Sequence, residues 1–120
     1  MVKVTTDPDQ QLIEVQMSGL VGINEAVKVS NQLKKAMMAF GPKQAILLID
    51  LVGFAPAAKD VLPVVRGIGR DVISFFRKAA LVQEFSMDLQ GRKVIEAPPG
   101  YKLPSYTTRE KAIEYLQDAG

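Results

Sequence analysis

Few side chains in this sequence could carry out chemistry, and cysteine and histidine are both missing. Without them the chain has no thiolate nucleophile, no imidazole base, no Ser-His-Asp triad and no Cys/His zinc site. An enzyme made from the remaining residues would use carboxylates, lysine, arginine, tyrosine or hydroxyls, or a Mg²⁺ ion held by carboxylates. The acidic residues do not cluster with a spacing suited to metal binding. We therefore expect no catalytic residues, no metal and no cofactor.

The best-placed carboxylate is Asp50, which follows the apolar run 46–49 and precedes a glycine turn at Gly53. In this position the side chain could orient a ligand at the edge of a sheet, or it could cap the turn. An enzymatic role would require Asp50 to meet Lys59 or Tyr106 in one cleft, within hydrogen-bond reach. Of three functional hypotheses, we favour this one least.

The residues after Asp50 form a candidate binding loop. Phe54 begins an apolar stretch that continues to Ala58 and that could contact a partner. The same aromatic ring could instead fold back onto the core. Two charged residues follow at the predicted start of a helix. The candidate ligand or partner site therefore consists of Asp50, Gly53, Phe54, Lys59 and Asp60.

A second candidate surface is a basic stripe on a helix predicted from about Asp60 to Arg77. Apolar residues recur there at helical spacing, and basic residues align on the opposite side. Gly67 and Gly69 could kink or break the helix, because each costs up to about 1 kcal/mol relative to alanine. Such a stripe is ordinarily a solvated helix face, and an anionic partner, a lipid surface or a nucleic acid is the alternative. Its members are Lys59, Arg66, Arg70 and Arg77.

Length and composition indicate one domain spanning residues 1–120. At 120 residues and 48% hydrophobic, the chain can bury one core. The net charge of +2 gives no reason to expect a nucleic-acid partner. No apolar run approaches the roughly 20 residues of a membrane helix, and the first residues lack the apolar stretch of a signal peptide. We therefore expect a cytoplasmic protein.

Hydrophobic periodicity predicts alternating strands and helices. Residues 2–6 and 11–18 alternate as a hairpin with one wet face, and the run 44–51 predicts a strand buried on both faces. The predicted elements are, in order, strands at 2–6 and 11–18, a turn at 19–22, a helix from 24 to about 40, a strand at 44–51, the helix at 60–77, a strand at 79–85, a helix at 86–96, a strand at 101–106 and a helix from 107.

Helix starts and the last strand carry their own markers. Asn24 can cap the first helix and Ser86 the third. Thr107 and Glu110 have the spacing of a capping box at the start of the last helix. Pro104 lacks a backbone N–H, and this restricts the last strand to a sheet edge or shortens it. The result is an α/β fold with a mixed sheet of about five strands, an N-terminal hairpin and about four helices.

This order of elements resembles the STAS fold and, more specifically, its SpoIIAA-like branch of small bacterial proteins related to anti-sigma-factor antagonists. The residues that carry the resemblance are the strand from Ile46 to Asp50, the turn at Gly53 and the closing segment 106–116. That segment reads Tyr-Thr-Thr-Arg-Glu-Lys-Ala-Ile-Glu-Tyr-Leu and is similar to the branch's final Glu-x-Ala-x-x-aromatic-Leu helix. The resemblance implies a regulatory, non-catalytic binding domain.

The sequence departs from this family at one position of functional importance. Antagonists of this fold carry a phosphorylatable serine in an Asp-Ser-Ser-Gly at the start of the helix that follows the Asp-Leu strand. Here Lys59 and Asp60 occupy those positions, and no serine or threonine occurs between Asp50 and Ser74. The resemblance therefore implies the fold and a binding role without the phosphorylation switch, which needs a hydroxyl.

Besides the enzyme, two functional hypotheses remain open. We favour a regulatory or protein-interaction module that uses the loops after the central strands and the face of the second helix. The alternative is a carrier or sensor of a small apolar or anionic, lipid-like ligand. Its pocket would lie between Met37, Met38 and Phe40 of the first helix and the Phe75-Phe76 end of the second.

The expected partner is thus a protein or a small ligand, without nucleic acid, and a peripheral membrane contact is disfavoured. A homodimer is a further hypothesis. The strand at 2–6, or the one around Pro104, would offer unpaired backbone groups to a second copy if it formed a sheet edge.

Overall fold

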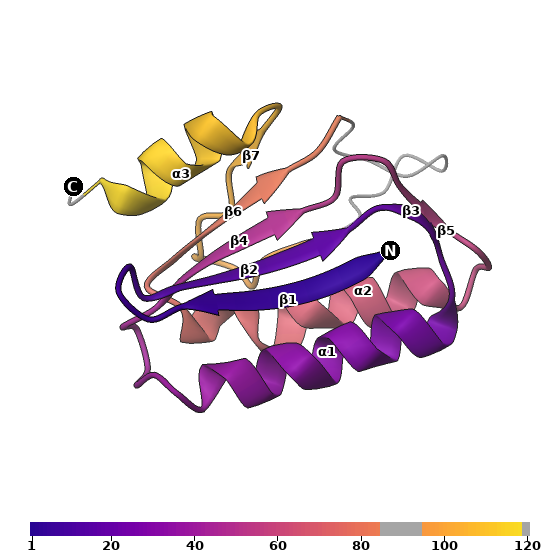
Figure 1. The fold of residues 1–120 in the computed structure, drawn as a ribbon, viewed down its shortest axis with the longest axis horizontal. Coiled ribbons are helices and arrows are strands. Elements are labelled where there is room, and N and C mark those ends of the chain that lie inside the picture. The colour runs from indigo at the N-terminus through magenta and orange to yellow at the C-terminus, as the bar shows by residue number, and fades with distance from the viewer. Residues whose placement is uncertain (85–94, 119–120) are drawn as a thin grey trace.

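A five-stranded mixed sheet lies at the centre of the computed structural model, which describes residues 1–84 and 95–118 (Figure 1). The strand order is β1-β2-β4-β6-β7, with β1 antiparallel to β2 and the other neighbours parallel. The sheet strands are β1 (Val2–Asp7), β2 (Leu12–Met17), β4 (Ile46–Asp50), β6 (Lys78–Val82) and β7 (Ser105–Tyr106). This arrangement confirms the predicted hairpin, and it places the strand beside Pro104 at a sheet edge.

Helices cover both faces of the sheet. Helices α1 (Ile23–Met37) and α2 (Val61–Asp71) lie on one face, and α3 (Arg109–Gln117) lies on the other (Figure 1). Connections between parallel strands are right-handed, so crossovers that advance in one direction from β2 to β4 to β6 place their helices on the same face. Helix α3, which follows β7, covers the opposite face.

Strand β4 is the buried centre that its apolar run predicts. Residues Ile46, Leu47, Leu48 and Ile49 are all buried, and β4 pairs in parallel with a strand on each side. Its odd-numbered residues join the large core under α1 and α2. Its even-numbered residues join a smaller cluster under α3. The central strand therefore divides the molecule into two apolar layers.

A second, two-stranded sheet appears where only a turn was predicted. Strand β3 (Gly19–Val21) pairs in parallel with β5 (Phe54–Pro56) at one end of the molecule (Figure 1). The turn chemistry is nevertheless present, because Gly19 and Gly53 adopt positive φ angles of 68° and 76°. The pattern was missed because three residues are too few to show an alternation.

Helix α2 is shorter than predicted, since it ends at Asp71 and not near residue 77. Val72 leaves the helical conformation, and a 3₁₀ turn over Ile73–Phe75 leads into β6. Lys59 precedes the first residue of α2 and Arg77 lies beyond its last, so the four basic residues do not form one continuous helix face. The prediction of a stripe along a single helix was therefore wrong.

Two predicted caps are displaced, and one predicted helix cannot be compared. The N-cap of α1 is Gly22, two residues before the predicted Asn24, and the N–H of Gly22 donates to Glu25 Oε1 at 3.4 Å. The cap of α3 is Thr108, not Thr107, and its Oγ1 accepts the N–H of Lys111 at 3.4 Å. The helix predicted at 86–96 and the end of the strand at 79–85 fall largely outside the described residues.

Candidate functional site

Asp50 is the last residue of β4 and is half-buried on the α3 face of the sheet. Its Oδ1 accepts the backbone N–H of Val52 at 3.0 Å, so the carboxylate does cap the turn. The register pairs Asp50 with Gln16 of β2 and with Val82 of β6. The side chain therefore stands in a row across the sheet between polar Gln16 and apolar Val82.

Gly53 and Phe54 continue the chain from this turn toward the other face. The carbonyl of Gly53 accepts the N–H of Gly19 at 2.8 Å, which joins the turn to β3. Phe54 is half-buried and packs against the large core under α1 and α2. The aromatic ring thus folds back onto the core, and it lies on the opposite side of the sheet from Asp50.

Lys59 and Asp60 are exposed at the start of α2. Asp60 occupies the N-cap position, but its side chain makes no capping hydrogen bond. The N–H of Ala57 donates to the carbonyl of Val21 at 2.8 Å and holds this segment beside β3. Of the basic residues, Arg70 pairs with the adjacent Asp71 at 3.2 Å, an exposed contact of small energetic value.

Three exposed apolar residues lie on neighbouring backbone segments beside these residues, on a surface that we call the apolar end and define as Met1, Leu20 and Val52. Their exposed fractions are 67%, 70% and 37%. Backbone hydrogen bonds bring the three segments together, because Met1 pairs with Ser18 and Gly19 pairs with Gly53. Sequence patterns did not indicate this surface, because Leu20 fell within a predicted turn.

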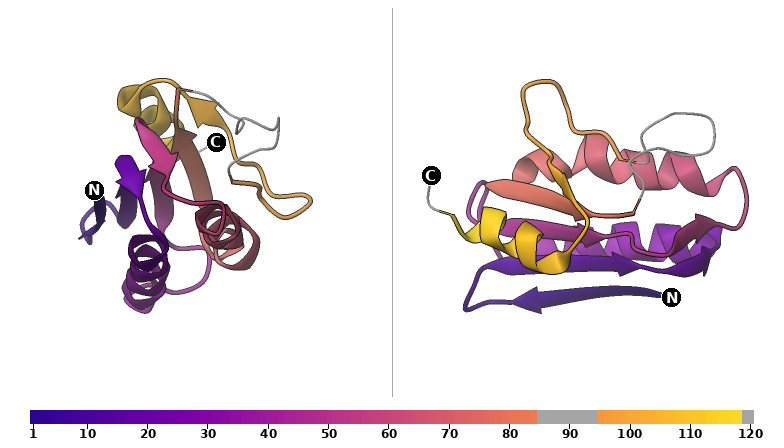
Figure 2. Two further views of the ribbon diagram at one scale, coloured as in Figure 1. Left: turned by 90° about the vertical axis from the view of Figure 1, so that its right-hand side faces the viewer. Right: turned by 90° about the horizontal axis from the view of Figure 1, so that it is seen from above.

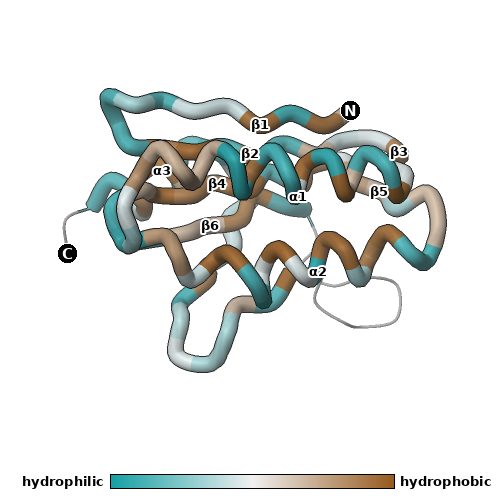
Figure 3. The backbone as a smooth tube through the Cα atoms, turned by 90° about the horizontal axis from the view of Figure 1, so that it is seen from below, coloured by the Kyte–Doolittle hydropathy of each residue, from teal (hydrophilic) through white to brown (hydrophobic). Residues whose placement is uncertain are grey.

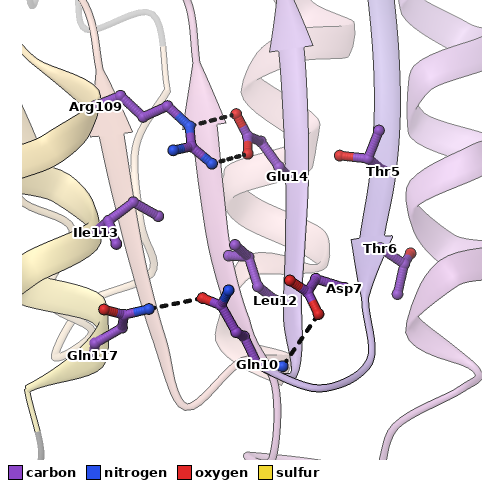
Figure 4. A pocket seen from close by; sticks show the side chains of 9 residues that line it. All are labelled: Thr5, Thr6, Asp7, Gln10, Leu12, Glu14, Arg109, Ile113 and Gln117. Atoms are coloured by element: carbon purple, nitrogen blue, oxygen red, sulfur yellow. Dashed lines mark hydrogen bonds and ion pairs between the residues drawn. The ribbon is translucent and has the colours of Figure 1, made fainter.

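A cleft of about 420 Å³ separates α3 from the β1–β2 hairpin (Figure 4). Arg109 spans it with two hydrogen bonds to Glu14, Nε to Oε2 at 3.1 Å and Nη2 to Oε1 at 2.8 Å. Gln117 Nε2 donates to Gln10 Oε1 at 2.7 Å near the other end of α3. These bonds fasten the helix to the hairpin. The cleft is lined by Thr5, Thr6, Asp7, Gln10, Leu12, Glu14, Arg109, Ile113 and Gln117.

The Arg109–Glu14 pair is the strongest electrostatic feature of this cleft. Hydrogen bonding to Glu14 raises the pKa of the Arg109 guanidinium, partial burial opposes the rise, and the charges of Glu14 and Asp50 add to it. The guanidinium therefore stays charged, and it is hydrogen-bonded to the Glu14 carboxylate. No local sequence signal could have found the pair, because 95 residues separate its members.

A second cleft of about 460 Å³ lies beside β6 and β7. Gln83 stands out there, since its side chain is only 6% exposed and its Nε2 donates to Ser105 Oγ at 3.1 Å. Tyr101 donates its hydroxyl to the carbonyl of Phe76 at 2.9 Å. Burial, aided by Tyr115, raises the pKa of Tyr101 to about 12, so this hydroxyl remains a donor at neutral pH. The described lining comprises Leu81, Gln83, Ile95, Glu96, Ala97, Tyr101, Leu103 and Ser105.

The structure does not bring together the groups that the enzyme hypothesis requires. Tyr106 lies two strands from Asp50 on the same row, about 10 Å away at the usual strand spacing, and stacks on Tyr115. Lys59 lies at the start of α2, on the other side of the sheet. Among the described residues, no cluster of carboxylates could hold a metal ion.

The residues of the predicted carrier pocket differ widely in exposure. Phe76 is fully buried in the core and packs edge to face against Phe75, with the ring centroids 5.6 Å apart. Met38 points into solvent and is 85% exposed. Met37, Phe40 and Phe75 are half-buried and pack against the same large core. The pocket between these helix ends remains a prediction, and the cleft beside Gln83 is a further candidate.

Comparison with solved structures identifies the fold. An uncharacterized protein of the DUF3478 family from Shewanella loihica PV-4, described as having a SpoIIAA-like fold, is similar over 97% of this chain and 92% of its own. The TM-score is 0.67 and the sequence identity is 11%. No family model matches the sequence, and no curated protein matches it.

The chain therefore has a SpoIIAA-like fold, as its order of elements and closing helix predict. In this fold Lys59 and Asp60 stand at the start of α2 where the resemblance places the antagonists' serines. None of the helices in the described part of the chain is long and apolar enough to cross a membrane.

Proposed function

We propose that this protein is a cytoplasmic, non-catalytic regulatory module that binds a partner protein through its apolar end. The observation that carries the proposal is the exposure of Leu20, at 70%, beside the exposed Met1 and Val52. Apolar side chains that gather on a surface mark contact sites more often than single exposed ones. The SpoIIAA-like fold supports a binding role as well.

Charged residues around the apolar end complete a surface of the usual interface type. Lys59 and Asp60 are exposed on the segment that hydrogen bonds hold beside β3. Protein interfaces commonly combine an apolar centre with a polar, solvated rim. Because the segment has no hydroxyl residue, we propose that partner binding here is controlled without phosphorylation.

Substituting Leu20→Ser tests the proposal. We expect affinity capture with the variant to lose the partner that the wild-type protein enriches, because a polar side chain cannot fill an apolar contact. Met38→Ser is the matched control, since Met38 is exposed at the C-cap of α1, away from the apolar end. Quantitative mass spectrometry of the captured proteins measures the effect. Equal enrichment by wild type and Leu20→Ser would reject the apolar end as the binding surface.

The cleft beside Gln83 supports a second candidate function, a carrier or sensor of a small apolar ligand. Gln83 is the one buried polar side chain among the described residues, and apolar groups of Leu81, Ile95 and Leu103 surround it. Ligand sites often combine an apolar lining with a few fixed polar groups. The described lining contains Glu96 and no lysine or arginine, which favours an uncharged ligand over an anionic one.

Native mass spectrometry distinguishes the carrier from the interaction module. If the protein carries a ligand, the wild-type chain should show a mass excess that denaturation removes. Leu103→Trp should abolish that excess, because the larger side chain fills the cleft. A clean protein mass for the wild type, or an excess that survives Leu103→Trp, would argue against this site.

A further inference from the structure

Strand β1 is a free edge of the main sheet. It comes first in the strand order and pairs only with β2. Viewed from above and from below, β1 forms the margin of the molecule, and no other segment lies beyond it (Figures 2 and 3). Its six residues include no proline, so the whole strand can pair with another strand.

Hydrogen bonds at the start of the strand show which backbone groups point outward. Met1 and Ser18 exchange both backbone hydrogen bonds, which makes them a hydrogen-bonded pair of the antiparallel ladder. Such pairs alternate along the ladder, so Lys3, Thr5 and Asp7 also turn their N–H and C=O toward β2. The even-numbered residues of β1 therefore present their N–H and C=O groups at the open edge.

This alternation of inward-facing and outward-facing backbone groups restricts how a second copy of β1 could add to the edge. In a symmetric antiparallel pair, outward-facing residues must oppose each other, which allows Val4 to face Thr6 of the second copy. Thr5 then lies on the two-fold axis, opposite Thr5 of that copy. In the same register Lys3 of each copy lies opposite Asp7 of the other, so this pair occurs once on each side of the axis. The side chains of Lys3, Thr5 and Asp7 all point to the α3 face.

We propose that this protein forms a symmetric homodimer through antiparallel pairing of β1 with β1 of a second copy, centred on Thr5. Charge complementarity selects this register, because it places Lys3 of one copy directly opposite Asp7 of the other. The two residues form a non-hydrogen-bonded pair of the antiparallel ladder, in which the opposing Cα atoms are only about 4.5 Å apart. Lys3 is exposed. The turn N–H groups of Asp9 and Gln10 bond to Oδ1 of Asp7, and a carboxylate can accept further donors.

The dimer would join two five-stranded sheets into one continuous sheet and remove the free edge. The interface is isologous, as a two-fold axis requires. It does not use the apolar end, so the two proposals stand independently. A dimer would present two apolar ends, and a partner with two binding sites would gain avidity from it.

Sedimentation equilibrium over a series of protein concentrations tests the dimer. We expect the wild-type chain to approach twice its 13.1 kDa mass as concentration rises. Lys3→Glu should shift the equilibrium to monomer, because it places like charges opposite each other on both sides of the axis. Lys28→Glu is the charge-matched control, because Lys28 is an exposed residue of α1, and this variant should leave the dimer unchanged.

A second variant tests the backbone pairing without a change of charge. Thr6→Pro removes an N–H that points outward, and edge strands tolerate proline at such positions. We expect this variant to be monomeric and Thr6→Ala, which keeps the N–H, to remain dimeric. A wild-type chain that is monomeric at every concentration would overturn the proposal. So would a dimer that persists in both Lys3→Glu and Thr6→Pro.

Discussion

Leu116→Ala is expected to lower the free energy of unfolding by about 2–5 kcal/mol, the usual cost of truncating a buried leucine. Leu116 is fully buried and is the large side chain with which α3 covers the second apolar layer. Beneath it lie Leu48 and Ala80, on the central strands. Because small residues such as Ala112 complete the contact, little can move in to fill the space left by the lost atoms.

Chemical denaturation of the variant measures this loss, and Ile113→Ala provides the control on the same helix. Ile113 is only half-buried at the edge of the cluster, so its truncation should cost clearly less. Hydrogen exchange adds a local measurement, because a weakened α3 should lose amide protection before the central strands do. Equal losses for the two variants would contradict the arrangement of α3 over the sheet.

The central architecture was predictable because its signals are local and repeated. The apolar run at β4 predicts a strand buried on both faces, and the alternation in β2 predicts the hairpin and its inner face. The closing Glu-x-Ala-x-x-aromatic-Leu segment forms α3, with Ala112 and Leu116 buried. Each of these patterns extends over several residues, so one exception does not hide it.

The parts that were missed depend on residues distant in sequence. Strand β3 forms only because β5 is available to pair with it, and neither segment has a pattern of its own. The Arg109–Glu14 pair joins the last helix to the second strand. Leu20 was placed in a turn, so its exposure could not be anticipated. Of the predicted site, Asp50 lies on one face of the sheet and Phe54 packs against the core of the other.

The two glycines of α2 have different structural roles. A Cβ on Gly69 would lie 2.3 Å from the carbonyl oxygen of Glu96 and 2.8 Å from Ile95 Cγ2. A Cβ on Gly67 would have ordinary contacts of 3.7 Å with the side chains of Arg70 and Asp71. Gly69 is therefore a point of close approach between the helix and the segment before β7, whereas Gly67 can accommodate a methyl group.

Gly69→Ala should accordingly destabilise the protein by about 1–3 kcal/mol, because an added methyl group in a packed contact forces the backbone to shift. Gly67→Ala is the matched variant, two residues earlier in the same helix. It should be neutral or should stabilise by up to about 1 kcal/mol, since alanine favours the helix more than glycine does. Urea denaturation of both variants beside the wild type measures the difference.

The pair of variants also decides whether the glycines act as a hinge. A hinge needs conformational freedom at both positions, so alanine at either would rigidify α2 and stabilise the folded state in similar ways. Close packing at Gly69 predicts different changes in the free energy of unfolding. Gly69→Ala should lower it, and Gly67→Ala should not. If Gly69→Ala proved as stable as the wild type, the segment at Ile95 and Glu96 could not lie close enough to Gly69 to exclude a methyl group.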